Sequence, residues 1–489
     1  MADTDSGATR TDAQAAPRKG INLLGLIALV VSSSIGSGVF ALSTDISRAA
    51  APGAAILTWL ITGIGFMALA TTFGRLSLER PDLNGIVAYA KEGFGSFTGF
   101  VSGWGYWLSI WIGNVAFGVM FVTAIGYFVP AFSGALAIPG VVLISAINWL
   151  IVWLVNRGVE EASIVNTVVM ICKLVPIFAF IVTMIAVFKF DVFTADFWGN
   201  LANNMGEESA PGSLGTQVVN CLMVMMWVFV GMEGASVLGH RAQRARDVSR
   251  ATMIGTTALV VIYIAASILP YGYMTRAELM ALDAPSMPYI FQSVVGPWGG
   301  AFISLGLIIS IFGSWLSYTI LASEAMRGMA DMKLLPAAFG KLNRHGAPTA
   351  CLVTTGIMIQ ILAVVMLFSE AAYQFAYSLC TASIIISWSL AAAYMVRYSR
   401  TTRQKGWRTS TALALFACAF LVAAVLLAGV DLLLLCCIAY VPGIVFFLIA
   451  RREDANSEPF SVRDRIVCAG IVLLAVLACL LLATGAITI

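Results

Sequence analysis

The chain has 489 residues, of which 60% are hydrophobic and only 11% are charged, and its mean hydropathy is +0.91. An ordinary soluble domain has about a quarter of its residues charged. The composition therefore excludes a soluble protein and indicates a chain that crosses a lipid bilayer many times. The net charge of +3 is uninformative as a total, but the positions of the charges are informative.

Residues 1–20 are polar and small, with neither an apolar core nor a cleavage site, so we expect a cytosolic tail rather than a signal peptide. Thirteen apolar runs follow, each long enough for a bilayer core of about 30 Å, which needs about 20 residues per helix. The sequence predicts an all-α polytopic membrane protein with about 13 transmembrane helices. The runs lie near residues 21–43, 52–73, 97–129, 136–156, 162–188, 214–238, 252–273, 297–325, 348–368, 371–396, 409–429, 432–450 and 466–487.

The lysines and arginines predict the orientation. With the N-terminus in the cytoplasm, 24 of the 28 basic residues fall in cytosolic segments, which is the bias of a cell (inner or plasma) membrane protein. The odd number of spans then places the C-terminus on the extracytoplasmic side. Every basic cluster adjoins a span on the predicted inner side, so we interpret these clusters as topological anchors and expect no nucleic-acid partner.

Glycine interrupts the first apolar run at residues 35–38, which read Ile-Gly-Ser-Gly. A helix can unwind at membrane depth only where protein or a water-filled cavity satisfies the freed backbone groups. Free N–H groups at the start of a half-helix would suit a carboxylate. A small-residue contact between two helices is the alternative interpretation of this motif.

A second interruption, Gly231-Met232-Glu233-Gly234, lies in the run that begins near residue 214. Paired interruptions in the two halves of a membrane chain indicate a transporter's substrate site, so the pair favours a site over a helix contact. Carbonyls freed between residues 227 and 230 could accept hydrogen bonds from an ammonium group. A carboxylate at membrane depth is costly unless it is used, although a structural Glu233 that joins two helices is the alternative.

Three further features belong to spans 3, 5 and 8. Tyr106, Ile110 and Asn114 recur at i, i+4 and i+8, so they share one helical face. Tyr318 offers an aromatic face that could hold a cation, an attraction of about 0.5–2 kcal/mol, although packing is the commoner role of an aromatic residue in a span. For Lys173 we favour a structural role, either neutralising a buried carboxylate or reaching the membrane interface.

Catalytic and metal-binding motifs are missing from the sequence. His240 and His345 both fall in predicted cytosolic loops, and there is no HExxH, no glycine-rich phosphate loop and no pair of intramembrane aspartates. The nine cysteines lie within or at the start of apolar runs without metal-ligand spacing, so we interpret them as reduced packing residues. We therefore expect no enzyme activity, no catalytic residue, no metal site and no cofactor.

Together, these motifs resemble those of the amino acid–polyamine–organocation superfamily. The resemblance runs from the stretch at residues 35–40 through Trp111-Ile112-Gly113-Asn114, Lys173-Leu174-Val175-Pro176 and residues 227–234 to Leu334-Leu335-Pro336. Within the superfamily the chain resembles the basic amino acid/polyamine antiporters, and among them the bacterial arginine/ornithine antiporters. The stretches at residues 313–317, 439–443 and 485–489 carry this finer resemblance.

The resemblance implies a leucine-transporter-like fold with two inverted repeats of five helices. Its domain plan would be a cytosolic tail at 1–20, a transporter core at 21–400 with repeats at 21–188 and 214–400, and three additional C-terminal helices at 401–489. The expected partners are small cationic amino acids and the lipid bilayer. The sequence leaves open whether chains associate as homo-oligomers.

The resemblance also implies the roles of the candidate site residues. Residues Ile35 to Gly38 would bind the substrate, with Ser37 and the backbone of its two glycine neighbours taking the carboxylate. The other implied substrate-binding residues are Ser109, Ile110 and Asn114 for the side-chain pocket, Val230 and Gly231 for the α-amine, Trp227 as an aromatic gate, and Tyr318. Trp227 and Glu233 would act in gating or coupling. Many relatives have tryptophan where this chain has Tyr318, which weakens the implied preference for arginine.

The leading hypothesis from sequence is an alternating-access exchanger of arginine for ornithine. The first alternative is a proton-coupled or amino acid/amine exchanger of the lysine/cadaverine, arginine/agmatine or histidine/histamine type. The second alternative is a substrate sensor that does not transport, although the chain carries no additional signalling domain.

Overall fold

The computed structural model describes residues 20–83, 85–132, 137–158, 162–205, 210–237, 242–368, 372–428, 431–454, 460–484 and 487. The predicted tail at 1–20 therefore lies outside the described residues except for Gly20. Within the described ranges the chain is helical and forms no β-strand; its one isolated bridge joins Ile21 to Ala242.

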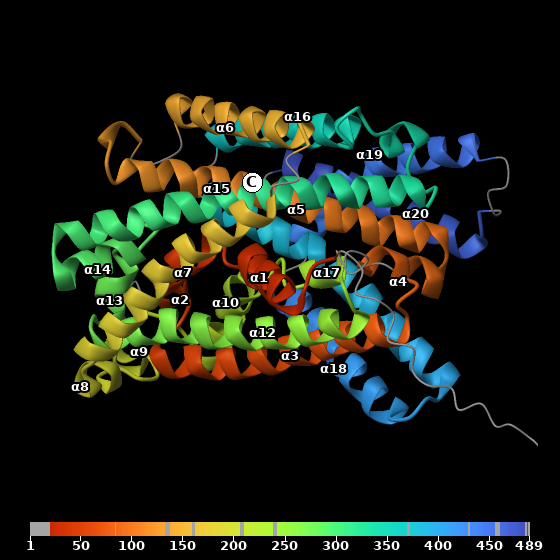
Figure 1. Cartoon of the computed structure of the whole chain (residues 1–489). Coiled ribbons are helices and arrows are strands. Elements are labelled where there is room, and N and C mark those ends of the chain that lie inside the picture. The colour runs from red at the N-terminus through yellow and green to blue at the C-terminus, as the bar shows by residue number, and fades with distance from the viewer. Residues whose placement is uncertain are drawn as a thin grey trace, which may run out of the picture.

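Long apolar helices lie side by side in one bundle (Figure 1). The first predicted span is a pair, α1 (Leu23–Ser34) and α2 (Gly38–Ala49), and the sixth is α10 (Leu214–Trp227) followed by the short α11 (Gly234–Val237). The unbroken ones are α3 (Pro52–Glu79), α5 (Ser96–Gly126), α6 (Ile138–Asn156), α7 (Ala162–Val187), α12 (Ala245–Ile268), α15 (Pro297–Asp331), α16 (Thr349–Val365), α17 (Ala372–Thr402), α18 (Trp407–Ala428), α19 (Asp431–Glu453) and α20 (Val462–Ala483).

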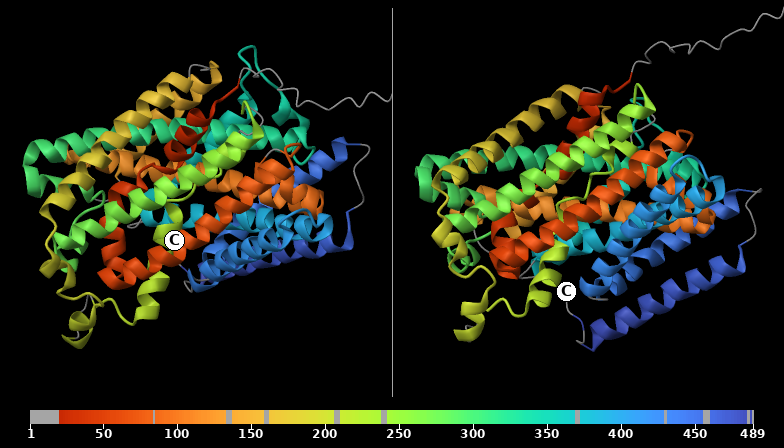
Figure 2. Two further views of the ribbon diagram at one scale, coloured as in Figure 1. Left: turned by 60° about the horizontal axis from the view of Figure 1, so that its bottom comes forward. Right: turned by 90° about the horizontal axis from the view of Figure 1, so that it is seen from below.

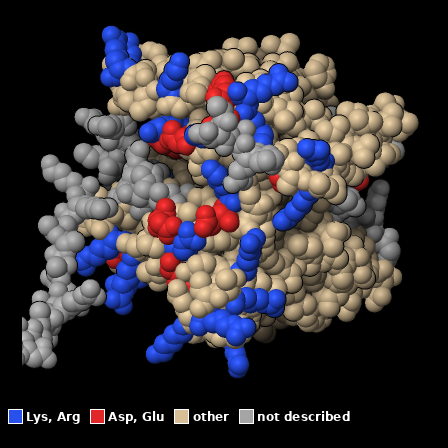
Figure 3. Space-filling model, turned by 90° about the vertical axis from the view of Figure 1, so that its right-hand side faces the viewer, with Lys and Arg blue, Asp and Glu red and all other residues tan. Residues whose placement is uncertain are grey.

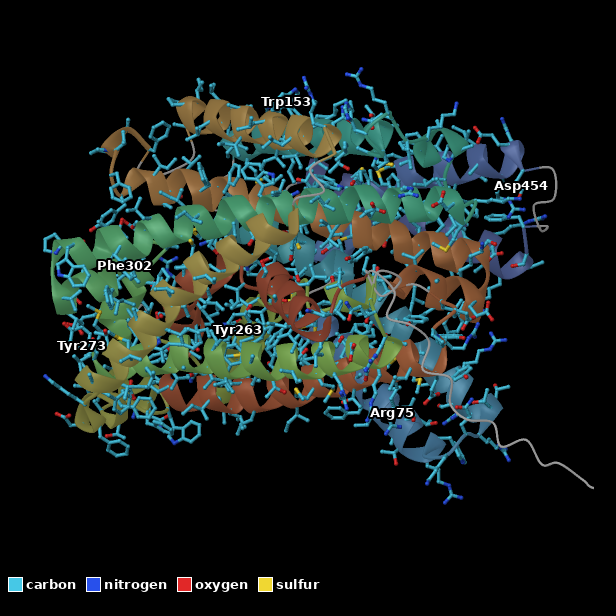
Figure 4. The ribbon with its side chains drawn as sticks, viewed as in Figure 1. Arg75, Trp153, Tyr263, Tyr273, Phe302 and Asp454 are labelled. Atoms are coloured by element: carbon cyan, nitrogen blue, oxygen red, sulfur yellow. The ribbon has the colours of Figure 1, made fainter. Side chains whose placement is uncertain are left out.

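Shorter helices mark the two ends of the bundle. At one end, on the right of Figure 1, lies α4 (Gly85–Phe94); we name it the α4 end. At the opposite end, on the left, lie α8 (Phe190–Thr194), α9 (Asn200–Met205), α13 (Arg276–Met280) and α14 (Met287–Val295); we name it the α13 end. Arg75 and Asp454 lie toward the α4 end, and Tyr273 lies toward the other (Figure 4).

The all-α polytopic fold predicted from the sequence is confirmed. The described residues contain ten unbroken helices of sufficient length and apolarity to cross a membrane, or eleven when α1 and α2 count as one span. The two remaining predicted spans correspond to α7 and α10, whose described apolar stretches, Ile171–Val187 and Leu214–Trp227, are shorter. Several helices extend beyond the predicted ranges, because charged residues continue α3 to residue 79 and α15 to residue 331.

Helices at equivalent positions of the two predicted repeats pack against each other. α3 contacts α12, α5 contacts α15 and α6 contacts α16, and these are the second, third and fourth helices of each half. The two interrupted spans lie in the middle of the bundle, where α1 and α10 appear between the longer helices (Figure 1). This pairing is what two inverted repeats would produce, while the domain boundaries themselves stay a prediction.

Burial divides the bundle into a central part and a lipid-facing part. The apolar window of α5 is 89% buried, whereas that of α20 is 11% buried. Figure 2 shows the C-terminal helices along one side of the molecule, with α20 outermost in its right-hand view. A helix that is apolar on every side and exposed in the folded chain needs lipid around it, so α20 belongs to the periphery and α5 to the centre.

Arg80 joins three elements at the α4 end. Its guanidinium donates to the carboxylates of Asp82 at 2.6 Å and Glu92 at 3.3 Å, and also to the hydroxyl of Tyr394 on α17. Lysine and arginine side chains gather at this end of the molecule, with a few acidic groups between them (Figure 3). This cluster holds the ends of α3, α4 and α17 together.

The hydrogen bonds from Arg80 lower the pKa of Asp82 below its ordinary value. A lowered pKa means that the stabilisation is complete above the unfolded value of about 3.9 and is lost as the pH falls through the folded value. We expect Asp82→Asn to lower stability by at most about 1 kcal/mol at pH 7, because the pair is exposed, and by less at pH 3. Thermal unfolding of the purified protein in detergent measures both differences. A difference that does not change with pH would contradict this assignment.

Candidate functional site

The first span is interrupted at residues 35–37, and its two halves meet at an angle of 47°. Carbonyl groups at the end of α1 have no partner within the helix at such a break. Two side chains from α15 bind carbonyls at the break instead: Ser314 donates to the carbonyl of Ile35 at 3.3 Å, and Ser310 donates to that of Gly36 at 3.3 Å. The break is therefore part of the helix packing.

Lys173 on α7 makes three hydrogen bonds at this break. Its fully buried ammonium donates to the carbonyls of Ser32 at 2.9 Å and Ile35 at 2.7 Å, and to the hydroxyl of Ser314 at 3.0 Å. A cation is favourable at the carboxyl end of a half-helix, where the helix dipole is negative. The structural role expected for Lys173 is thus observed, but its partners are carbonyls and a hydroxyl rather than a carboxylate or the membrane interface.

The start of α2 is polar and uncapped. The side chain of Ser37 occupies the N-cap position without capping the helix, and the hydroxyls of Ser34 and Ser37 are buried without a hydrogen bond. Unpaired buried polar groups cost about 1–3 kcal/mol each, so a cluster of them is unusual. The uncapped amino end of a half-helix together with two hydroxyls can bind an anionic group.

The second break is a series of tight turns from Val228 to Glu233. Hydrogen bonds from residue i+3 to residue i replace the helical pattern, as between the N–H of Val230 and the carbonyl of Trp227 at 3.1 Å. Gly231 has a φ of +105°, and a Cβ there would lie 2.7 Å from the carbonyl oxygen of Ser33. Only glycine combines that conformation with such a close approach of two backbones.

The two breaks touch each other through Ser33. Its hydroxyl oxygen lies 2.8 Å from the carbonyl oxygen of Gly231 and 2.7 Å from that of Leu29, so its one proton is shared between the two acceptors. On the opposite side of the turn, Phe229 stacks on Phe66 at a centroid distance of 4.1 Å and meets Tyr263 edge-on at 5.5 Å. Tyr263 belongs to α12 (Figure 4). The aromatic anchor and the Ser33 bond hold the unwound segment in one position against α1.

A small cavity lies between the breaks. Its volume of about 10 Å³ is close to the minimum for one water molecule, so the described conformation leaves no room there for an amino acid. The residues that line it are Ser34, Gly36, Gly38, Phe117, Trp227, Val228, Val230 and Tyr318. Five of these eight are residues that the sequence predicted as substrate-binding.

The remaining predicted residues lie around this cavity rather than in its wall. Ser109 contacts the sulfur of Cys380 at 3.3 Å, and Asn114 donates to the hydroxyl of Thr319 at 3.4 Å. Ile110 is buried on the same helix, α5. Gly113 faces the cavity more directly, because a Cβ there would lie 3.3 Å from the Tyr318 ring.

Sequence reasoning missed Phe117 and Cys380. Phe117 lies seven residues after Ile110, so continuing the predicted face of the third span by two helical turns would have found it. Cys380 on α17 is buried and accompanies Ser109 beside Gly113. A buried cysteine in an apolar run has no sequence signal that separates it from packing residues.

Tyr318 binds the second break directly. Its hydroxyl donates to the carbonyl of Val230 at 2.9 Å, and its ring meets Phe117 at a centroid distance of 5.0 Å. Phe117 in turn lies 6.0 Å from Trp227. These three rings make an aromatic wall around the small cavity, and aromatic faces of this kind attract cations.

Glu233 is buried on the other side of the turn. Its carboxylate accepts the N–H of Gly231 at 3.3 Å and the indole N–H of Trp388 at 3.3 Å. The hydroxyl of Tyr106 lies close enough to interact with this carboxylate, although its geometry is too poor for a hydrogen bond. A buried carboxylate with two neutral donors retains a negative potential that a substrate cation could use.

A large cavity of about 840 Å³ opens at the α4 end and reaches Tyr106. Its charged lining comprises Asp82, Lys91, Glu92, Glu324, Arg327 and Asp331. Most of these groups pair with each other or with Arg80, as Arg327 does with Glu324 at 3.6 Å and Asp331 at 3.8 Å. The lining holds four acidic and two basic side chains, so the cavity has a modest negative charge that attracts a cation, and the residues behind Tyr106 add to this selection.

The described residues contain no group of three or more His, Cys, Asp or Glu side chains that could hold a metal ion. The breaks themselves offer hydrogen-bond donors, carbonyl acceptors, aromatic faces, one carboxylate and one lysine. This set can bind a zwitterion with a cationic side chain, because it offers an anion site at the start of α2 and acceptors around the second break.

Comparison with known proteins identifies the family of the chain. A family model described as amino acid permease matches residues 21–476. The chain is 48% identical over 474 residues to an arginine/ornithine antiporter of Latilactobacillus sakei, covering 97% of this chain and 99% of that protein. It is 35% identical over 472 residues to an arginine/ornithine antiporter of Pseudomonas aeruginosa, covering 94% and 96%. It is also 33% identical over 475 residues to an arginine/agmatine antiporter of Chlamydia felis, covering 96% and 97%.

The geometry at Gly231 predicts the effect of adding one methyl group. We expect Gly231→Ala to lower the unfolding temperature in detergent, because a residue held at positive φ costs about 1–3 kcal/mol and the Cβ would collide with Ser33. Gly470→Ala is the matched control, since a Cβ at this helical position of α20 would meet no atom within 4 Å. The control should leave stability unchanged or slightly raised. Equal stability of both variants would contradict the proposed constraint.

Proposed function

Because the chain belongs to the amino acid permease family, we propose that it is a membrane antiporter that exchanges cationic amino acids, arginine for ornithine, by alternating access. The observation that carries the proposal is the meeting of two interrupted spans at one small cavity with an aromatic wall and a carboxylate beside it. The similarity to arginine/ornithine antiporters over nearly the whole chain supports this choice of substrates.

Each part of the substrate has a complementary group at the breaks. The α-carboxylate would bind the backbone of residues 35–38 and the hydroxyl of Ser37 at the start of α2. The α-amine would bind carbonyls of the second break near Val230. A carbonyl oxygen has two lone pairs, so Val230 can accept from an amine while it accepts from Tyr318.

The cationic end of the side chain would lie among Trp227, Phe117 and Tyr318. A guanidinium or ammonium over an aromatic face gains about 0.5–2 kcal/mol, more when the site excludes water. Ser109 and Cys380 lie next to Gly113 at the same wall and would offer weak acceptors to the guanidinium. Arginine and ornithine share the zwitterionic end and differ only at this wall.

Alternating access would open the small cavity to one end of the bundle at a time. The described conformation has its large cavity at the α4 end, with Tyr106 in the wall and Glu233 behind it. We assign the α4 end to the cytoplasm, since lysines and arginines gather there (Figure 3). Tyr106, Glu233 and Trp388 would then form the inner gate, and Trp227 the aromatic gate on the other side.

Exchange of two substrates of equal charge has a simple energetic consequence. Moving one charge across the membrane is worth about 2.3 kcal/mol per 100 mV. When arginine enters as ornithine leaves, the two contributions cancel. The proposed exchange therefore needs neither a membrane potential nor an ion gradient.

This cancellation gives the main test. Proteoliposomes loaded with ornithine should take up labelled arginine at the same rate whether or not a potassium diffusion potential is imposed. Empty proteoliposomes should take up almost none. Electroneutral exchange would be refuted by uptake that follows the potential or that needs no internal substrate. An amino acid/amine exchanger would be favoured if agmatine, cadaverine or histamine competed more strongly than ornithine. Binding without uptake would indicate a sensor.

A second test concerns Glu233. Glu233→Gln keeps an oxygen that can accept from Trp388 but removes the charge, so we expect normal folding and a roughly tenfold or greater fall in the maximal exchange rate. Glu233→Asp keeps the charge and should retain more activity than the glutamine variant. Exchange rates measured from pH 5 to 8 check this expectation. Unchanged exchange by Glu233→Gln at every pH would refute a gating or coupling role.

A further inference from the structure

A second buried carboxylate lies in the first span, beyond its break. Asp45 is on α2, seven residues after Gly38, and only 7% of its surface is exposed. Within the described residues Asp45 has no hydrogen bond and no ion pair within 4 Å. Arg48, one turn further along α2, instead donates to the carbonyls of Met280 at 3.3 Å and Leu282 at 3.2 Å. The Asp45 carboxylate is therefore buried without a hydrogen bond or a close ion pair, and the charge of Arg48 attracts it only from beyond 4 Å.

Stability does not explain this carboxylate. Burying a charge without a paired group is unfavourable. Asp45 also lies near the carboxyl end of α2, which ends at Ala49, and a negative charge is unfavourable at that end of a helix. Burial and the helix dipole thus oppose an aspartate at this position, and only the more distant charge of Arg48 favours it, so a function that uses the carboxylate is the better explanation.

Aromatic side chains connect Asp45 to the site already described. The carboxylate interacts electrostatically with the hydroxyls of Tyr373 and Tyr377 on α17. Tyr373 meets Tyr377 edge-on at a centroid distance of 5.2 Å. Tyr377 stacks on Trp227 at 6.0 Å with an angle of 23° between the rings. Asp45 is therefore linked by two rings to the face of Trp227 that stacks on Tyr377.

Unpaired polar groups gather at the same place. The hydroxyl of Tyr373 lies close to the side chains of Ser37 and Trp227, but no two of these groups are aligned well enough to form a hydrogen bond. Tyr373 is 94% buried, and the hydroxyl of Ser37 and the indole N–H of Trp227 are buried as well. Buried polar groups without partners are rare in folded proteins, and three of them beside an unpaired carboxylate point to a ligand.

We propose that Asp45, Tyr373, Tyr377 and the adjoining face of Trp227 form a second cation site, which binds the guanidinium or ammonium group of an amino acid before it passes Trp227. This inference rests on the proposed function and adds a binding step to it. A carboxylate with aromatic faces on one side is the chemistry that recognises an organic cation. The substrate would then pass along one row of rings, Tyr373, Tyr377, Trp227, Phe117 and Tyr318, with Asp45 at one end and Glu233 near the other.

The site faces one side of the membrane only. α2 leads from the first break toward α13, as the hydrogen bond from Thr44 to the carbonyl of Leu279 shows. The large cavity opens at the opposite, α4 end. Asp45 would therefore bind a substrate as it enters from the α13 end, which the proposed orientation places outside the cell. It would not take part in the binding of a substrate that enters from the α4 end, which meets Asp45 only as it leaves.

The test compares uptake from the two sides. In cells that express the full chain and contain ornithine, we expect Asp45→Asn to raise the KM for arginine uptake about tenfold with little change in maximal rate. In inverted vesicles the KM should match that of the unaltered chain. Asp45→Glu should restore most of the affinity. Asp283→Asn, which removes an exposed carboxylate at the same end of the bundle, is the matched control and should have no effect.

Two further measurements separate a site from a structural role. The unfolding temperature of Asp45→Asn in detergent should be unchanged or higher, since the carboxylate is destabilising. Guanidinium chloride at millimolar concentration, against an equal concentration of sodium chloride, should inhibit uptake by the unaltered chain more than uptake by Asp45→Asn.

The results that would overturn the second site differ from those that would overturn the proposed function. A KM for Asp45→Asn equal to that of Asp283→Asn, or an equal rise on both sides of the membrane, would overturn the second site. A large fall in unfolding temperature would also overturn it, because Asp45 would then be a structural residue. If the unaltered chain exchanges no arginine for ornithine, the proposed function fails instead.

Discussion

The rest of the structure depends on one constraint: backbone groups freed within a membrane must find partners inside the protein. At the first break the partners are Lys173, Ser310 and Ser314, and at the second they are Ser33 and Tyr318. These side chains come from α1, α7 and α15, so unwinding two helices requires three helices in fixed positions. The polar contacts that make the interruptions tolerable are the same contacts that hold the centre of the bundle together.

This constraint also explains why binding and movement are coupled. Tyr318 occupies a carbonyl of the second break, and Glu233 binds the N–H of Gly231 within the same turn. A substrate amine that binds the carbonyl of Val230 beside Tyr318 would add a second donor to a group that already contacts α15. Binding would thereby change how α15 and α17 are held against the broken spans. A ligand that binds one arrangement of these helices more tightly than another shifts the balance between the two.

The sequence predicted the features that depend on strong and local signals. Runs of about twenty apolar residues predict spans whatever their packing, and the paired glycine interruptions with Glu233 predicted the centre of the site. Long-range contacts were not predictable in the same way. Nothing near Lys173 indicates that its ammonium meets the end of α1, 138 residues earlier in the chain. Cys380, Tyr373 and Tyr377 lie on α17 in an ordinary apolar pattern, so only the folded arrangement distinguishes them from packing residues.

The length of α15 has a mechanical consequence. Its 35 residues extend about 52 Å at 1.5 Å per residue, well beyond a hydrocarbon core of about 30 Å. Ser310 and Ser314 attach the middle of this rod to the first break, whereas Glu324 to Asp331 form part of the wall of the large cavity. α15 can therefore tilt as a rigid helix about its point of attachment at the first break. A tilt of about 10° around that point would move each end of the helix by about 4–5 Å. A small rearrangement at the first break would therefore widen or narrow the large cavity at the α4 end.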